Sequence, residues 1–342
     1  MAKKMLDLSY VLSLRDFLDS HPCIGFDVRT KVLYPLLDEV FRDGDQLGIR
    51  LENGLFFNYS YKSNIAKEIL LRDKEVPDHV WEPMTTRSVE LALRYRPGPV
   101  LIGGAYFGDH ALVAAHEISV ANRSGVVVCV EPNQQQREIL ENNAAINNLS
   151  GYISLLDSVL WSTSGLKFDL SATDSHASVF PGGSSEYSSK TIDEILVDHG
   201  LREISLILLD IEGSEEQALR GATSALSLPS DQAPVVITEI HRKYVDWSNG
   251  LEKTPIVSCL LGHGYHVFAL RDCQSNWSLG LDSPEIIPLD RVCLEGPPHG
   301  FNLIAAKDAG FFGDQRFRIV HDVSPKYLRH RDPAIHFPLS LD

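Results

Sequence analysis

From residue 100 onwards, the hydrophobic pattern alternates between short, wholly apolar runs and longer segments with helical spacing. A wholly apolar run is typical of a strand buried on both faces, and helical spacing between such runs indicates crossover helices. This order predicts an α/β fold with a mostly parallel sheet and helices on both of its faces. The seven predicted strands are residues 100–102, 126–130, 152–156, 205–210, 234–240, 265–270 and 301–306.

Helical segments separate these strands. Thr85 or Thr86 is expected to begin the first helix, and the sequence Pro97-Gly98-Pro99 ends it just before the first strand. The Ser- and Gly-rich stretch at 171–190 is either a surface insertion or a lid over a ligand. The other predicted helices cover residues 109–120, 134–147, 214–226 and 255–261.

The two ends of the chain differ from this α/β region. Residues 1–80 show helical spacing and alternating charge without a chemical motif, which predicts a mainly helical accessory region. Residues 81–310 form the predicted α/β domain, and residues 311–342 a C-terminal extension. We expect the flanking regions to shape either a small-molecule pocket or a contact in a homo-oligomer. The basic residues of the extension are expected to be solvated rather than to bind an anionic ligand: His321, Arg329, His330, Arg331 and His336.

Composition narrows the possible partners. The 342 residues carry a formal net charge of −15, which disfavours a phosphate backbone and argues against nucleic acid as a partner. No apolar run approaches the ~20 residues that span a bilayer, and the N-terminus has the pattern of an amphipathic helix, so no membrane association is expected. The five cysteines include no Cys-x-x-Cys pair, which argues against a zinc knuckle. We therefore expect a cytoplasmic protein.

Four polar motifs stand where predicted strands end. In a doubly wound sheet, ligands bind outside the carboxyl ends of the strands, so these motifs are the candidates for a binding site. They are GGAYFG at 103–108, EPN at 131–133, DIEG at 210–213 and EIH at 239–241.

The first two motifs point to a nucleoside. GGAYFG lacks the dinucleotide fingerprint, because Ala105 occupies the second glycine position. The spacing of Gly104 and Gly108 suits a loop beneath an adenosyl group without a pyrophosphate. Glu131 follows Gly108 by 23 residues, where a carboxylate can accept hydrogen bonds from both ribose hydroxyls. NAD and S-adenosylmethionine both carry this ribose, so Glu131 alone leaves both cofactors open.

The last two motifs supply acid–base chemistry. Asp210 and Glu212 are two apart and share one face of an extended chain, and Glu239 and His241 repeat this spacing on the neighbouring strand. These side chains could converge on a substrate hydroxyl or on a divalent cation such as Mg²⁺. His241 is equally well explained as a supporting or surface histidine. The acids expected to be solvated in a first helical turn are Glu215 and Glu216.

The order GAYFG, VEPN, LDIEGSEEQALRGA and VVITEIH resembles the FkbM family of S-adenosylmethionine-dependent methyltransferases, over roughly residues 98 to 308. The resemblance implies a Rossmann-like class I methyltransferase fold with a seven-stranded sheet. It also implies methyl transfer from S-adenosylmethionine to an oxygen of a sugar, a polyketide or a related natural product. Its most specific block contains Asp210, Glu212, Gly213, Glu215, Leu219, Gly221 and Ala222.

The resemblance also assigns site residues. Glu131 would hold the ribose, Asp157 and Ser158 would lie near the adenine, and Asp210 and Glu212 would face the methyl group. In many members, an Asp that helps to orient the methionine moiety of the cofactor stands where this chain has Ile102. Either Glu82, Thr86 or Arg87 takes over that role here, or cofactor binding is weakened. The remaining residues assigned to the cofactor site are Gly103, Gly104, Ala105, Gly108 and Asn133.

These residues suggest one mechanism and leave two other functions open. Asp210 or His241 would act as the base, while Glu212 and Glu239 orient that base or hold Mg²⁺. One alternative is an NAD(P)-dependent oxidoreductase, which the missing second glycine opposes. The other is a non-catalytic, methyltransferase-like binding protein, which Ile102 favours.

Overall fold

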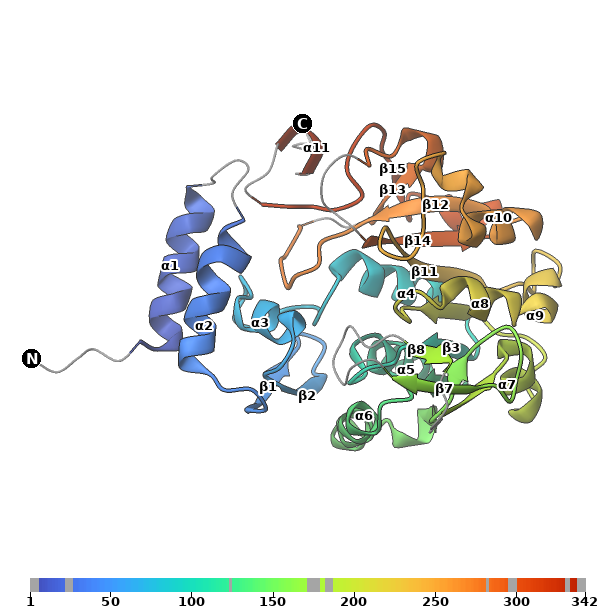
Figure 1. Cartoon of the computed structure of the whole chain (residues 1–342), viewed down its shortest axis with the longest axis horizontal. Helices are drawn as coiled ribbons and strands as arrows, with labels where there is room; N and C mark the ends of the chain where they lie inside the picture. The colour runs from blue at the N-terminus through green and yellow to red at the C-terminus, as the bar shows by residue number, and fades with distance from the viewer. Residues whose placement is uncertain are drawn as a thin grey trace, which may run out of the picture.

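A mixed sheet forms the centre of the computed structural model, which describes residues 6–21, 27–122, 125–170, 179–181, 187–280, 283–294, 300–329 and 333–336 (Figure 1). Within these residues the sheet has nine strands in the order β15-β13-β12-β14-β11-β10-β3-β4-β5. Their bounds are β3 Val100–Gly103, β4 Val127–Val130, β5 Ile153–Leu156, β10 Leu206–Leu209, β11 Val235–His241, β12 His266–Arg271, β13 Glu285–Pro288, β14 Gly300–Ala306 and β15 Arg318–Ile319.

The strand directions confirm the Rossmann-like class I methyltransferase fold. β5, β4, β3, β10 and β11 pair in parallel, whereas β14 runs antiparallel to both β11 and β12. The carboxyl ends of β3, β4, β10, β11 and β12 therefore lie along one side of the sheet, here called the carboxyl edge. All seven predicted strands are present, and the short strands β13 and β15 extend the sheet beyond them.

Each face of the sheet has its own apolar core, because successive strand residues point to opposite faces. Ile102 belongs to the core beneath α4, α5 and α6, and its neighbour Leu101 belongs to the core beneath α7 to α10. The helix bounds are α4 Pro83–Tyr95, α5 Asp109–Val120, α6 Gln134–Ile146, α7 Ile192–Asp198, α8 Glu215–Arg220, α9 Thr223–Ser227 and α10 Pro255–Gly262.

Two helix boundaries differ from the prediction. The helix expected at 214–226 is divided into α8 and α9 at Gly221, where a Cβ atom would collide with the carbonyl oxygen of Trp161. The start of α4 is capped from a distant strand instead of by its own threonines. The carboxylate of Asp272 accepts hydrogen bonds from the backbone amides of Met84 (3.1 Å) and Thr85 (2.7 Å).

The N-terminal region packs against this domain and shares its core. Val11 and Phe57 lie in the same apolar cluster as Ile102, and Asn143 of α6 binds the backbone of Asn58 in both directions. The region includes a β-hairpin that the helical spacing did not predict. Its elements are α1 Leu8–Ser20, a π-helical turn Arg29–Leu33, α2 Tyr34–Val40, β1 Gln46–Arg50, β2 Phe56–Ser60 and α3 Asn64–Leu70.

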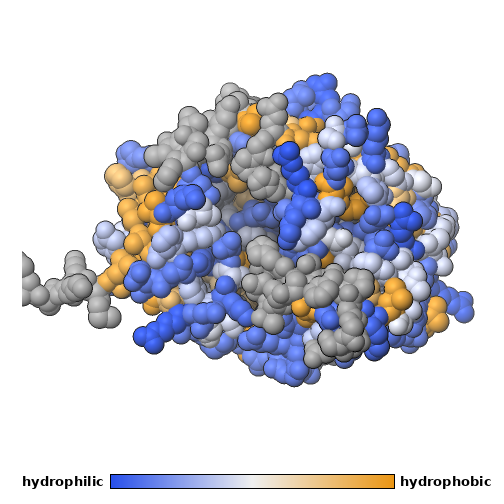
Figure 2. All heavy atoms as spheres, viewed as in Figure 1, coloured by the Kyte–Doolittle hydropathy of each residue, from blue (hydrophilic) through white to orange (hydrophobic). Residues whose placement is uncertain are grey.

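The C-terminal segment returns to the N-terminal helices (Figure 1), where Arg329 pairs with Asp19 of α1 at 2.6 Å. The segment ends in the short helix α11 Pro333–His336. Figure 2 shows apolar side chains gathered on the side of the molecule where α1 lies, and Phe17 is 59% exposed there. No helix in the described part of the chain is long and apolar enough to cross a membrane.

A small second sheet lies beside β5. It consists of β6 Val159–Leu160, β7 Lys167–Leu170, β8 Val179–Pro181 and β9 Tyr187–Lys190. Of the Ser- and Gly-rich stretch, only residues 179–181 and 187–190 are described, so the choice between a lid and a surface insertion lies outside the described residues.

Candidate functional site

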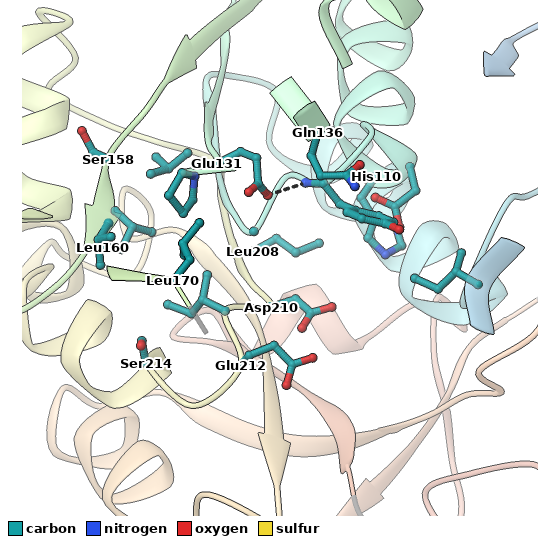
Figure 3. Close-up of a pocket in the computed structure, with 18 of the residues that line it drawn as sticks. His110, Glu131, Gln136, Ser158, Leu160, Leu170, Leu208, Asp210, Glu212 and Ser214 are labelled. Atoms are coloured by element: carbon teal, nitrogen blue, oxygen red, sulfur yellow. Dashed lines mark hydrogen bonds between the residues drawn. The ribbon is translucent and has the colours of Figure 1, made fainter. Parts of the chain in front are cut away.

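A pocket lies at the carboxyl edge, between the ends of β3, β4 and β10 (Figure 3). Five of the residues that line it were predicted from the sequence: Gly104, Glu131, Ser158, Asp210 and Glu212.

The glycine loop after β3 forms part of the pocket floor. Gly104 has a φ of +75°, and a Cβ atom there would collide with the backbone oxygen of Asp210. Only glycine therefore lets this loop lie against the end of β10. Gly103, Ala105 and Gly108 do not line the pocket; Gly103 packs against Leu160, and Gly108 begins α5. These three residues support the conformation of the loop without lining the pocket.

Glu131 is fixed at the end of β4 by two backbone amides. Its carboxylate accepts hydrogen bonds from the backbone N–H groups of Tyr106 (2.9 Å, dashed in Figure 3) and Asn133 (2.9 Å), one at each oxygen. Burial raises the pKa of this carboxyl group. Each carboxylate oxygen has a further lone pair, so Glu131 can still accept two hydroxyl groups, as the ribose of a nucleoside requires.

The residues expected near Glu131 differ in whether they line the pocket. Ser158 lines the pocket, whereas Asp157 is exposed and does not. Asn133 lies outside the lining, and its side-chain oxygen caps α6 by accepting the amide of Gln136 at 3.2 Å. Asn133 therefore orients the segment that carries Glu131.

An apolar slot lies on one side of Glu131. Leu160 and Leu170 reach it from the small sheet, and Leu208 from β10. In Figure 3, Leu160 and Leu170 lie on the side of Glu131 opposite His110. A slot lined by aliphatic side chains beside a ribose-binding carboxylate suits a flat heterocyclic base.

The opposite part of the pocket is acidic. Asp210 and Glu212 project in the same direction into it (Figure 3). Burial, together with the negative charges of Glu239 and Glu82, raises the pKa of the Asp210 carboxyl group well above its usual range. Glu212 has a φ of 51°, and its carboxylate accepts a hydrogen bond from the hydroxyl of Tyr244 at 2.9 Å. Residues held in this strained conformation cluster at functional sites.

Glu215 corrects an expectation. It is only 3% exposed, and its carboxylate accepts the backbone amides of Ile211 (3.0 Å) and Gly213 (3.0 Å). Burial raises its pKa to about 7. Glu215 therefore holds the loop that presents Glu212, instead of being solvated in a helical turn. Its neighbour Glu216 pairs with Arg220 nearer the surface, at 2.9 Å.

Glu239 and His241 lie at the end of β11 but do not line the pocket. Burial and the charges of Glu215 and Glu212 raise the pKa of Glu239 to about 8. His241 accepts the backbone amide of Lys243 at its Nδ1 atom (2.9 Å), and its ring lies 5.5 Å from that of Tyr244. Asp210 is therefore the candidate base that borders the pocket, and His241 supports the neighbouring loop.

The carboxyl edge does not form a recognisable metal centre. Among the described residues, no three His, Cys, Asp or Glu side chains are arranged to hold a metal ion. The structure therefore lends no support to the predicted Mg²⁺.

Several lining residues were not predicted. Tyr106, Asp109 and His110 come from the glycine loop and the first turn of α5. Their position inside the first motif was a signal that could have identified them. Ile65 comes from the N-terminal region and Trp81 from the segment just before α4, and no sequence motif indicates that either packs on the carboxyl edge.

The three candidates for the role of the missing acid at Ile102 have different partners in the structure. Ile102 itself is 1% exposed. Glu82 is buried next to Trp81 and accepts a hydrogen bond from Asn302 Nδ2 at 2.6 Å. Thr86 donates to the backbone of Trp81, and Arg87 pairs with the carboxylate of Glu90 at 2.6 Å. None of the three candidates lines the pocket itself, although Glu82 directly follows the lining residue Trp81.

The C-terminal extension does not present the solvated basic strip that was expected. His336 is 4% exposed and hydrogen-bonds to the backbone oxygen of Lys326, and Arg329 lies over the ring of Trp277. His321 is exposed. His330 and Arg331 lie outside the described residues.

Comparison with known proteins identifies the domain. A solved structure of similar fold is the O-methyltransferase from Bacillus cereus in complex with SAH, with 14% identity over 66% of this chain and 81% of that one and a TM-score of 0.37. Another is the ribosomal protein L11 methylase from Lactobacillus delbrueckii subsp. bulgaricus, with 14% identity over 65% and 77% and a TM-score of 0.35. No curated protein was found to match the sequence. Residues 103–267 match the family model of the Methyltransferase FkbM domain, and the chain therefore carries an FkbM methyltransferase domain.

Proposed function

We propose that this chain transfers a methyl group from S-adenosylmethionine to a hydroxyl oxygen of a small molecule. The observation that carries the proposal is the charge of the pocket. Its described lining includes the carboxylates of Asp109, Glu131, Asp210 and Glu212 and no Lys or Arg. Such a wall favours a cationic sulfonium and repels the pyrophosphate of a dinucleotide.

The residues present fit this cofactor. Glu131 would accept the ribose hydroxyls, the slot at Leu160 and Leu170 would take the adenine, and Gly104 would allow close approach of the backbone. When bound, S-adenosylmethionine supplies a methyl group activated by a positively charged sulfur.

Asp210 is the proposed base. Its carboxylate borders the pocket, and its raised pKa increases its affinity for a hydroxyl proton. Glu212, held by Tyr244, would orient the hydroxyl group of the acceptor. Sugars, polyketides and related natural products remain the proposed acceptors, because the family resemblance suggests them.

Calorimetry with S-adenosylhomocysteine and with NADH tests the proposal. We expect S-adenosylhomocysteine to bind and NADH not to bind. Asp210→Asn should retain that binding and lose methylation of any hydroxylated acceptor that the native protein accepts. Binding of NADH alone would support an oxidoreductase, and binding of neither compound would support a non-catalytic protein.

A further inference from the structure

The amino-acid end of the proposed cofactor needs a partner that the end of β3 does not provide. This end carries an ammonium group, and a buried ammonium requires a carboxylate or several hydrogen-bond acceptors. Ile102, at the end of β3, is apolar and buried. The ligand for this ammonium must therefore come from another element.

Asp109 is placed to bind it. It begins α5 directly after the glycine loop, and its side chain lines the pocket. Burial raises the pKa of this carboxyl group, and the neighbouring His110 and backbone amides offset that rise only in part. Within the described residues, no Lys or Arg is found in an ion pair with Asp109. His110, the next residue, lies on the side of Glu131 opposite the apolar slot (Figure 3). The amino-acid end of an adenosyl cofactor would point to that side.

Glu82 supplies a second carboxylate behind this part of the wall. It follows the lining residue Trp81, and its backbone has a φ of 45°, a conformation that is rare and unfavourable outside glycine. Glu82 does not itself line the pocket, but its negative charge raises the pKa of both Asp109 and Asp210.

The orientation of Glu82 is fixed by the strand β14 and by the C-terminal segment. Asn302 of β14 donates to one of its carboxylate oxygens at 2.6 Å, and Lys326 of the C-terminal segment pairs with the other at 3.3 Å. Lys326 is 1% exposed. Lys326 pairs with Glu82 and not with Asp109, and a bound ammonium group would add a second cation.

We propose that Asp109 and Glu82 form the site for the α-ammonium group of S-adenosylmethionine. Asp109 contacts the ammonium group, and Glu82 supplies a second negative charge behind Asp109. The proposal rests on the proposed function. It also rests on the ribose site at Glu131 and the apolar slot, which independently fix the direction of the ligand in the pocket. The acidic residues are thereby assigned to ligand recognition and not only to proton transfer.

Calorimetry with two ligands tests this site. S-Adenosylhomocysteine carries the amino-acid end, whereas 5′-methylthioadenosine has the same adenosine and a thioether without it. Asp109→Asn and Glu82→Gln should each weaken S-adenosylhomocysteine by about 10- to 100-fold, the range of a charged hydrogen bond. The same variants should leave 5′-methylthioadenosine within about twofold of the native value.

Two controls make the outcome specific. Glu131→Gln should weaken both ligands, and Glu90→Gln, which alters a carboxylate of α4 outside the pocket, should weaken neither. Equal weakening of both ligands by Asp109→Asn, or no weakening by either variant, would overturn the site. Failure of the native protein to bind both ligands would instead refute the proposed function. Asp109→Asn keeps the test valid if Glu82→Gln impairs folding.

Discussion

Glu239 illustrates how burial changes the behaviour of a single residue at the carboxyl edge. The pKa of its carboxyl group rises from 4.5 to about 8 in the folded protein. The stabilisation from this group is complete below pH 4.5 and is lost as the pH rises through 8. Glu239→Gln removes the ionisation, so the variant should gain Tm relative to the native protein between pH 5 and pH 8.5.

Thermal unfolding at a series of pH values measures this gain. We expect about 2–4 °C for each kcal/mol of relieved charge burial, and almost none near pH 5. Glu216→Gln is the control, because Glu216 pairs with Arg220 nearer the surface. A difference that is the same at all pH values would show that Glu239 does not titrate in this range.

Tyr244 tests the positioning of Glu212. Its ring packs against Gly213, and its hydroxyl donates to Glu212 at 2.9 Å. Tyr244→Phe keeps the packing and removes the hydrogen bond, so kcat should fall about tenfold while S-adenosylhomocysteine binds as before. Tyr95→Phe is a matched control, because the Tyr95 hydroxyl binds Asp308 at the surface. An unchanged kcat would mean that Glu212 needs no support from Tyr244.

The loop between β3 and α5 is the element on which the pocket depends. Gly104→Ala forces an alanine into a left-handed conformation, which costs about 1–2 kcal/mol, and its Cβ atom collides with the backbone of Asp210. The variant should unfold at lower urea concentration and lose binding of S-adenosylhomocysteine. Gly151→Ala, with no atom near the added methyl group, should change neither property. Retention of full binding by Gly104→Ala would contradict the role of this loop.

The elements of the sheet could be predicted because their apolar runs are local in sequence. The motifs at their ends could be predicted as one site because parallel strands bring their carboxyl ends together. The cap that Asp272 provides to α4 could not be predicted, because it joins residues that are 187 positions apart along the chain. Trp81 was beyond reach for a similar reason, because only the packing of the folded chain places it at the pocket. Glu82, in contrast, was one of the three candidates named for the role of the missing acid.

At the scale of the whole molecule, the two ends of the chain complete the carboxyl edge. The C-terminal segment adds an isolated β-bridge next to β12, in which the backbone of Lys326 pairs in parallel with that of Asp272. Arg271 holds this segment through the backbone oxygens of Ser324 and Ile335. The extension is therefore part of the architecture that fixes Glu82, and not an independent tail.

Lys326→Met tests this architecture. The substitution leaves the Glu82 carboxylate buried without its cation, and the loss of one partner from a buried ion pair costs about 3–5 kcal/mol. Lys326 also lowers the pKa of Glu239 and of Asp272, whose carboxyl groups have pKa values of about 8 and about 6. The destabilisation should therefore be largest above pH 8 and should shrink as the pH falls below 6, where these groups are protonated. Urea unfolding at pH 5 and pH 8.5 measures it, with the exposed Lys253→Met as the control. Equal destabilisation at both pH values would mean that Lys326 acts through packing alone, whereas the expected difference would show that the C-terminal segment supplies charge to the carboxyl edge.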